Sequence, residues 1–331
     1  MAGAGTDLRV FGWRLARSNS CSIFCNDADV YHVGACPCAC PYWAATGGRP
    51  YNESGLDKKD KMMGMEKSQK TKISAIVRTF NEELNIRECL ESVSWADEII
   101  VVDAFSTDRT VEIANELTDR VILREWPGHV GQSQFATDQT ENLWVFSIDA
   151  DERVSPALRD EILALDLAKT PHDAFDMPRR HFFMQRWINH SGWYPDRNIR
   201  LYRKDRCWWG GYEPHDKIQV PGTLASLKGD LFHYIYRDIN HFAETKNRYA
   251  TRTARDHFGT GRRSTLLHFT LRPLFTFFDR YLIRRGILDG LPGYVISVME
   301  AYGVFLKYLK LYEMQHGLMR FPDQGPGRDA T

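Results

Sequence analysis

Two aspartates separated by one residue, Asp149-Ala150-Asp151, directly follow an apolar run and are well placed to do chemistry. Side chains at positions i and i+2 of an extended segment point to the same side, so both carboxylates can face one hard cation. Mg²⁺ or Mn²⁺ is the expected cation, because both favour oxygen ligands and bind phosphate. Such a cation would act as a Lewis acid and neutralise a departing diphosphate.

An isolated Asp-x-Asp triplet is also explained by a helix cap followed by a solvated acid, so the neighbouring elements must decide. Apolar runs over residues 73–77, 98–103, 121–123 and 143–148 alternate with helical patterns, which predicts a mostly parallel sheet with right-handed crossovers. Ligands of such sheets gather at the carboxyl ends of the strands. Three runs end there in polar clusters, which predicts one nucleotide crevice: Arg78-Thr79-Phe80-Asn81-Glu82, Asp103, and Asp149-Ala150-Asp151-Glu152.

Residues from about 72 to 155 resemble the nucleotide-binding half of the family 2 glycosyltransferases, which have the GT-A fold. The matching segments are Thr79-Phe80-Asn81-Glu82, the stretch 101–110 (VVDAFSTDRT), and Asp149-Ala150-Asp151-Glu152. The resemblance implies an α/β fold that binds a nucleotide sugar, with a Rossmann-like sheet flanked by helices and a C-terminal helical extension. It also implies a role for each matching residue: nucleotide contact for Thr79, Asn81 and Glu82, base contact for Asp103, proximity to the ribose and donor sugar for Asp149, and metal binding for Asp151.

The second half is similar to a bacterial subset of that family, the lipopolysaccharide core glucosyltransferases, which add a β-linked glucose to an inner-core heptose. The similar segments are residues 192–196 (GWYPD), 200–203 (RLYR) and 284–293 (RRGILDGLPG). The resemblance implies UDP-glucose as the donor and a glycolipid or glycan of the cell envelope as the acceptor. Transfer to another polysaccharide, a lipid carrier or a protein is the alternative.

That subset usually shows a His-Glu pair in the acceptor half, and the counterpart here is His215-Asp216. Family 2 enzymes are generally inverting, and an inverting transfer needs a base for the proton of the acceptor hydroxyl. We expect Asp216 to be that base, with Glu213 and Asp196 as alternatives. His215 is expected to orient the base or to help bind metal or phosphate, although a histidine hydrogen-bonded in an aromatic cluster explains it almost as well.

Changes in sequence texture divide the chain into four regions. Residues 1–70 are expected to be a poorly ordered extension that carries five cysteines, whose spacing fits no common zinc pattern, and ends in a Lys-rich linker. We hypothesise that translation begins at Met62, Met63 or Met65, which stand just before the first predicted strand. The catalytic domain is expected over 71–235, with a nucleotide-binding half at 71–155 and an acceptor half at 156–235. An amphipathic helical region at 236–316 and a tail at 317–331 follow.

Bulk charge and hydropathy restrict the partners. Lys plus Arg equals Asp plus Glu at 43 each, which argues against a nucleic-acid-binding protein. No run of eighteen apolar residues exists, so we expect no membrane-spanning helix. Between residues 237 and 285, however, Lys and Arg outnumber Asp and Glu eleven to four, and apolar residues interleave with them. This predicts docking on an anionic bilayer, hence a cytoplasmic protein on the inner face of a bacterial inner membrane. Packed helices with solvated arginines are the alternative.

Three other protein classes fit the sequence less well. A sugar nucleotidyltransferase would carry a Gly-rich loop after the first strand, where Arg78-Thr79-Phe80-Asn81 has no glycine. A phosphatase of the haloacid dehalogenase type expects Thr or Val two residues after the second Asp, where Arg153 stands. A non-catalytic nucleotide-binding scaffold is disfavoured because every acid that the nucleotide site needs is present.

Overall fold

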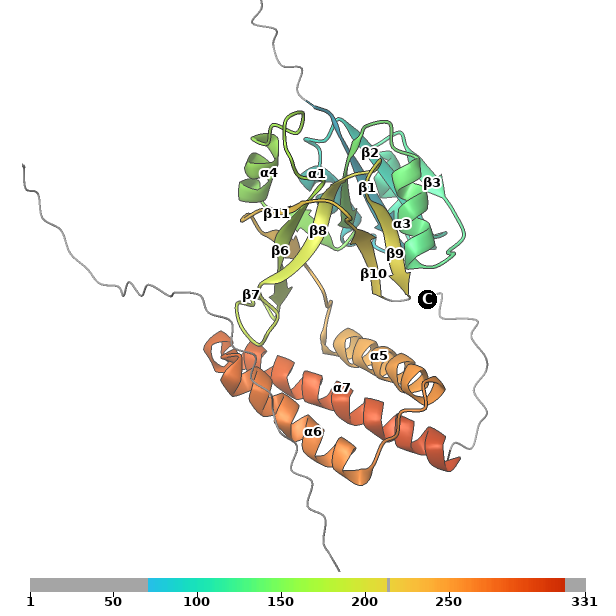
Figure 1. Cartoon of the computed structure of the whole chain (residues 1–331), viewed down its shortest axis with the longest axis vertical. Helices are drawn as coiled ribbons and strands as arrows, with labels where there is room; N and C mark the ends of the chain where they lie inside the picture. The colour runs from blue at the N-terminus through green and yellow to red at the C-terminus, as the bar shows by residue number, and fades with distance from the viewer. Residues whose placement is uncertain (1–70, 213–214, 319–331) are drawn as a thin grey trace, which may run out of the picture. The chain divides into compact units, whose positions relative to one another are not determined.

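The computed structural model describes residues 71–212 and 215–318 of the chain (Figure 1). The expected Cys-bearing extension and Lys-rich linker over residues 1–70 lie outside the described residues, as do Glu213 and nearly all of the tail. The side chain of His215 also lies outside what is described.

The nucleotide-binding half is a four-stranded parallel sheet in the order β3-β2-β1-β4. Its strands are β1 (Ile73–Thr79), β2 (Glu98–Asp103), β3 (Val121–Leu123) and β4 (Trp144–Asp149). Its helices are α1 (Ile86–Ser92), α2 (Thr110–Asn115) and α3 (His129–Asp138). The predicted apolar runs therefore form the strands that the sequence indicates.

Helix α3 has no obvious signal in the sequence, because the face that it buries is partly polar. Gln132, Ser133 and Thr137 are buried along with Ala136. Hydrogen bonds satisfy part of this face: the Thr137 hydroxyl is 2.7 Å from the Tyr202 hydroxyl. A polar buried stripe gives no apolar period of 3.6 residues, so hydrophobic periodicity misses the helix.

The acceptor half extends this sheet with strands of mixed direction. Strand β8 (Asp196–Arg203) runs antiparallel to β4, and β6 (Ala174–Phe183) runs antiparallel to β8. The remaining elements on or beside the sheet are β5 (Glu152–Val154), α4 (Pro156–Leu163), β7 (Arg186–Trp187), β11 (Leu224–Ser226) and β12 (Leu231–His233). Strands β9 (Trp208–Tyr212) and β10 (His215–Gln219) form a separate hairpin. The sheet is thus parallel in the nucleotide half and mixed as a whole.

Strand β1 is buried on both faces, as its continuous apolar run predicts. Ala75 and Val77 belong to one hydrophobic cluster, while Ile76 belongs to another on the opposite face of the sheet. The strand is therefore a rigid base for Arg78 and Thr79, the last residues before the crevice.

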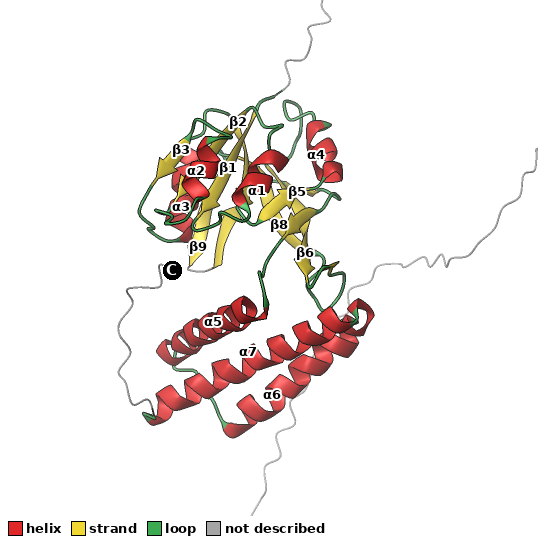
Figure 2. Cartoon of the chain, turned by 180° about the vertical axis from the view of Figure 1, so that it is seen from behind, coloured by secondary structure: helices red, strands yellow, loops and turns green. Residues whose placement is uncertain are grey.

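Three long helices form the C-terminal region: α5 (Ile239–Gly259), α6 (Leu266–Phe278) and α7 (Leu291–His316). Two short helical segments join α6 to α7: the π-helix η1 (Asp279–Ile283) and the 3₁₀ helix η2 (Gly286–Asp289). Helices α5 and α6 both pack against α7 (Figure 2). None of the helices in the described ranges is both long and apolar enough to cross a bilayer.

Residues 260–265 separate α5 from α6, whereas Pro292 and Gly293 lie within α7, although proline and glycine usually mark breaks in a helix. Pro292 lies in the first turn of α7, where its missing N–H removes no helical hydrogen bond. The chain changes direction earlier, at Arg285, which has a left-handed φ of 54°. Gly293 is required by close packing, because a Cβ there would lie 1.9 Å from the carbonyl oxygen of Gly286.

Candidate active site

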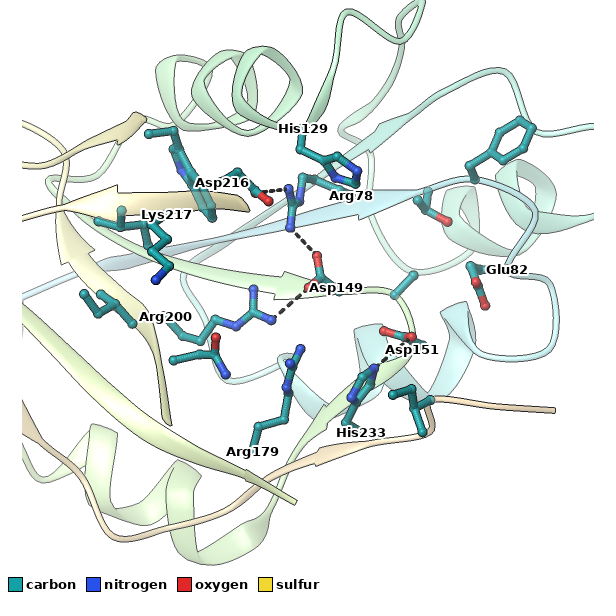
Figure 3. Close-up of a pocket in the computed structure, with 18 of the residues that line it drawn as sticks. Arg78, Glu82, His129, Asp149, Asp151, Arg179, Arg200, Asp216, Lys217 and His233 are labelled. Carbon is teal, nitrogen blue, oxygen red and sulfur yellow. Dashed lines mark hydrogen bonds and ion pairs between the residues drawn. The ribbon is translucent and has the colours of Figure 1, made fainter. Parts of the chain in front are cut away.

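A crevice of about 930 Å³ opens at the carboxyl ends of β1 and β4, where two of the polar clusters stand (Figure 3). Strands β8, β10 and β12 contribute side chains from the acceptor half, and helix α5 contributes from the C-terminal region. The lining is rich in charge and includes Arg78, Arg179, Arg200, Asp149, Asp151 and Asp216. The nucleotide-binding half, the acceptor half and the C-terminal helices therefore all contribute side chains to this crevice.

Asp149 lies between two guanidinium groups (Figure 3). Its Oδ1 is 2.5 Å from Arg78 Nη2 and its Oδ2 is 2.8 Å from Arg200 Nη2. Arg200 also pairs with the fully buried Glu152 at 2.5 Å. Burial raises the pKa of Asp149, but the two guanidinium groups outweigh burial and hold that pKa well below its ordinary value. Asp149 is thus an ionised anchor that orients two arginines at the crevice.

Asp151 has a different partner, His233. Its Oδ2 is 3.1 Å from His233 Nε2, and strand β12 brings the imidazole there by pairing with β5, which sets His233 opposite Glu152. Burial raises the pKa of Asp151, but the contact with His233 leaves it below its ordinary value. Behind His233 lies His181, whose pKa burial lowers to about 4, so this second ring is neutral at pH 7. The two carboxylates of the triplet therefore face different groups.

The Asp151–His233 pair fits part of a divalent cation site. Within the described ranges, no group of three or more His, Cys, Asp or Glu side chains is arranged around one cation position. The two donor atoms of the pair are 3.1 Å apart, and adjacent ligand atoms of an octahedral Mg²⁺ site are about 3 Å apart. The pair can thus supply two ligands, and the others would come from water and from the phosphates of a nucleotide, as is usual for Mg²⁺.

Asp216 lies in the same crevice, on the hairpin β9–β10. Its Oδ2 accepts a hydrogen bond from Arg78 Nη1 at 3.1 Å, and its side chain is 14% exposed. Arg78 also lies over the ring of Trp209, 5.2 Å from its centroid. Arg78 therefore connects the nucleotide half to the hairpin that carries the expected base.

The residues expected at the nucleotide are divided between the crevice and its surroundings. Thr79 and Glu82 line the crevice, and burial raises the pKa of Glu82. The Thr79 hydroxyl is buried and has no hydrogen-bond partner among the described residues, so it is available to a ligand.

Asn81 and Asp103 do not line this crevice. The Asn81 side chain accepts a hydrogen bond from the backbone N–H of Thr107 at 2.8 Å. Asp103 is fully buried and accepts bonds from the N–H and hydroxyl of Ser106 at 2.7 and 2.5 Å. Both side chains hold together the loops that follow β1 and β2.

Two charged residues of the crevice, His233 and Arg179, have no predicted role, and Arg78 is predicted at the crevice but without a role of its own. His233 follows Asp151 by 82 residues and belongs to no local motif, so only the strand pairing places it here. Arg78 did carry a signal, because it stands at the end of a buried strand within the first polar cluster. Arg179 lies on β6 and belongs to none of the motifs that the sequence offers.

Charged side chains gathered at the carboxyl ends of parallel strands are the arrangement with which α/β proteins bind phosphorylated ligands. Comparisons with known proteins define the class further. Residues 74–219 match the family described as Glycosyl transferase family 2. An uncharacterized glycosyltransferase of Rickettsia typhi is 32% identical over 255 residues, which are 73% of this chain and 87% of that protein. LpsC of Rhizobium meliloti, a lipopolysaccharide core biosynthesis glycosyltransferase, is 29% identical over 265 residues, which are 77% of this chain and 96% of that protein.

Among solved structures, the mannosyltransferase PcManGT from Pyrobaculum calidifontis, in complex with GDP-Man and Mn²⁺, aligns with 74% of this chain and 88% of that chain, at a TM-score of 0.47 and 14% identity. The chain belongs to family 2 of the glycosyltransferases, because it matches the family and is related to its members over most of their length. The predicted family and the predicted α/β fold class are confirmed.

Proposed function

We propose that this glycosyltransferase transfers a sugar from a UDP-sugar to a lipopolysaccharide core or related cell-envelope glycan, with inversion and with the help of a divalent metal. The observation that carries the proposal is the Asp151–His233 pair beside the arginines of the crevice, 3.1 Å between Oδ2 and Nε2. The relationship to LpsC supports the acceptor class. Glucose is the donor sugar that the sequence resemblance implies.

Asp151 and His233 hold Mg²⁺ or Mn²⁺ in this proposal. A bound cation supplies Lewis-acid stabilisation of the negative charge on the leaving diphosphate. Arg78 and Arg200 reach the same crevice, and Asp149 fixes both guanidinium groups. Preorganised cations of this kind stabilise charge that develops in a transition state.

Asp216 is the proposed base. One carboxylate oxygen accepts from Arg78 at 3.1 Å, which leaves the other oxygen to take the proton of the acceptor hydroxyl. Asp196 is a poorer candidate, because it does not line the crevice, whereas Asp216 does. His215 stays a proposed aid to the base or to metal or phosphate binding.

The test of this proposal is release of UDP from a panel of nucleotide sugars, with Mn²⁺ and with rough lipopolysaccharide as the acceptor. We expect release from one UDP-hexose that depends on both the metal and the acceptor. Release with a polysaccharide, lipid-carrier or protein acceptor instead would support the alternative acceptor classes. Binding of UDP without turnover on any acceptor would support a non-catalytic scaffold.

We further propose that an anionic phospholipid bilayer covers the outer face of α6 and the turns after it. No residue of α6 is buried. The exposed apolar side chains of this face are Leu266, Leu267, Leu271, Leu274, Phe275, Phe278, Leu282 and Ile283. Exposed arginines accompany them, including Arg262, Arg263, Arg284 and Arg285. Apolar side chains among basic ones complement an anionic bilayer, so the protein would lie on the cytoplasmic face of the inner membrane, close to a lipid-anchored acceptor.

Flotation with phosphatidylglycerol-containing vesicles tests this location. The full-length protein should float at low salt, and the double variant Leu274→Glu/Phe275→Glu should not. Leu123→Glu is the matched control, because Leu123 is 49% exposed on β3, away from α6, and its replacement should leave flotation unchanged. Equal flotation of both variants, or none by the original protein, would reject the bilayer as occupant.

A further inference from the structure

Four side chains form a continuous row with two buried histidines between two carboxylates: Asp151, His233, His181 and Asp196. Asp151 Oδ2 is 3.1 Å from His233 Nε2, and His233 Nδ1 is 2.9 Å from His181 Nδ1. His181 Nε2 is 3.5 Å from Asp196 Oδ2. Strands β12 and β6 are parallel neighbours with His233 directly opposite His181, so the sheet itself sets the contact between the two rings.

Asp196, at one end of the row, determines which nitrogen of each histidine ring carries a proton. Arg179 donates to Asp196 Oδ2 at 2.7 and 2.9 Å, so Asp196 is an ionised carboxylate that can only accept. The nitrogen of His181 that faces it, Nε2, must therefore carry the proton. A neutral imidazole has one N–H, so Nδ1 of the buried His181 is an acceptor, and Nδ1 of His233 must donate to it.

The same count of protons also applies to His233 and Asp151, at the other end of the row. In the neutral form of His233 the single proton lies on Nδ1, and Nε2 has a lone pair. That lone pair faces a carboxylate oxygen of Asp151 at 3.1 Å. Two lone pairs at this distance repel each other unless a positive charge lies between them. A proton on Nε2 supplies that charge when no metal is bound, and a divalent cation would take the place of that proton.

We propose that His181 is a positioning residue for the metal site: it accepts the Nδ1 proton of His233 and so holds Nε2 of His233 ready to bind a divalent cation beside Asp151. Metal-binding histidines ordinarily donate their second N–H to a fixed partner, and loss of that partner weakens metal binding about 10- to 100-fold. Here the partner is a second histidine, which Asp196 orients in turn. This inference rests on the metal-assisted function proposed above.

The reverse order of protons is inconsistent with these contacts. It would place the His181 proton on Nδ1 and leave a bare Nε2 facing the carboxylate of Asp196 at 3.5 Å. It would also place a proton on His233 Nε2, where the cation must bind. Of the two orders with neutral rings, only the first places a proton toward Asp196 and leaves Nε2 of His233 open to a cation.

Binding of Mn²⁺ in the presence of saturating UDP, measured by the EPR signal of free Mn²⁺, tests the proposal without any turnover. We expect His181→Leu to weaken Mn²⁺ binding about 10- to 100-fold. His181→Asn, whose side-chain oxygen replaces the acceptor at Nδ1, should stay within about threefold of the original protein, a recovery that a purely structural role would not produce. His172→Leu is the control for loss of a half-buried histidine, since His172 packs on Phe175 outside the crevice.

The outcomes separate this inference from the function on which it rests. If the original protein binds Mn²⁺ with UDP and His181→Leu binds it equally well, His181 does not position the ligand, and the proposed function stands. If the original protein binds no Mn²⁺ at all, the metal-assisted function fails and this inference fails with it. Equal losses in His181→Leu and His181→Asn would also overturn the acceptor role.

A second measurement reads the proton position directly. Long-range ¹H–¹⁵N correlation spectra of histidine-labelled, metal-free protein distinguish the two imidazole tautomers. We expect His181 to carry its proton on Nε2, with resonance assignment from the His181→Asn spectrum. A proton on Nδ1 of His181 would overturn the proposal.

Discussion

Arg200 at the crevice is 5% exposed, whereas Leu274 and Phe275 on α6 are 57% and 68% exposed. The crevice thus buries charge and α6 exposes hydrocarbon, the reverse of the ordinary distribution in a globular domain. In the crevice, ion pairs to Asp149 and Glu152 compensate the burial of Arg200. On the outer face of α6, the apolar side chains named above remain exposed within the described ranges.

The comparison shows that the two regions depend on different kinds of partner. A buried charge destabilises the folded protein unless a counter-charge lies beside it. The contacts within the protein therefore assemble the crevice, which is nearly complete before a ligand binds. An exposed apolar face costs little when the protein is in water but gains free energy when another apolar phase covers it. Substitutions in the crevice should therefore lower the transfer activity and the free energy of unfolding. Substitutions on α6 should instead lower the binding of the protein to membranes.

The largest effect is expected from loss of the metal ligand in the crevice. Asp151→Ala removes one of the two proposed protein ligands of the cation, and a catalytic cation contributes several kcal/mol of transition-state stabilisation. We expect sugar transfer to fall by about a thousandfold or more. UDP release assays measure this, and metal-free UDP binding should persist as evidence of an intact fold. Activity within tenfold of the original would place the metal elsewhere.

Loss of the proposed base should be the next largest effect. Asp216→Asn keeps the shape of the side chain but cannot take a proton, so transfer should fall by about 10²- to 10⁴-fold. The control is Asp205→Asn, because Asp205 pairs with Arg203 away from the crevice lining and its replacement should leave kcat unchanged. Near-normal turnover of Asp216→Asn would assign the base to another carboxylate.

Removal of a buried guanidinium tests the folding side of the comparison. Arg200→Met leaves Glu152, whose side chain has no exposed surface, without this ion-pair partner. Breaking a buried pair costs about 3–5 kcal/mol. Urea unfolding should show this loss, and a change below about 1 kcal/mol would mean that the pair is not needed to build the crevice.

The smallest change in stability is expected on α6. Leu274→Ser alters a side chain that is 57% exposed, and exposed substitutions usually change the free energy of unfolding by less than about 0.5 kcal/mol. The same variant should lower vesicle binding by roughly tenfold, since burial of a leucine side chain contributes about 1.5–3 kcal/mol. A large loss of stability with unchanged vesicle binding would reverse the contrast between the two regions.

The strands of the nucleotide half and the polar residues at their ends can be predicted from the amino-acid sequence alone. Apolar runs and the residues directly after them are local features, so they are enough to place Arg78, Asp149 and Asp151 at one edge of a parallel sheet. Local signals fail where burial is polar, as in α3, and where a proline suggests a break but starts a helix, as at Pro292.

The pairing of the charged groups, in contrast, depends on the tertiary structure. Asp149 and Asp151 are two residues apart, yet one faces Arg78 and Arg200 and the other faces His233. His233 reaches Asp151 through the pairing of β12 with β5, and it reaches His181 through the pairing of β12 with β6. Such contacts join residues that are far apart in the chain, and strand register, which no local pattern encodes, determines which side chains meet.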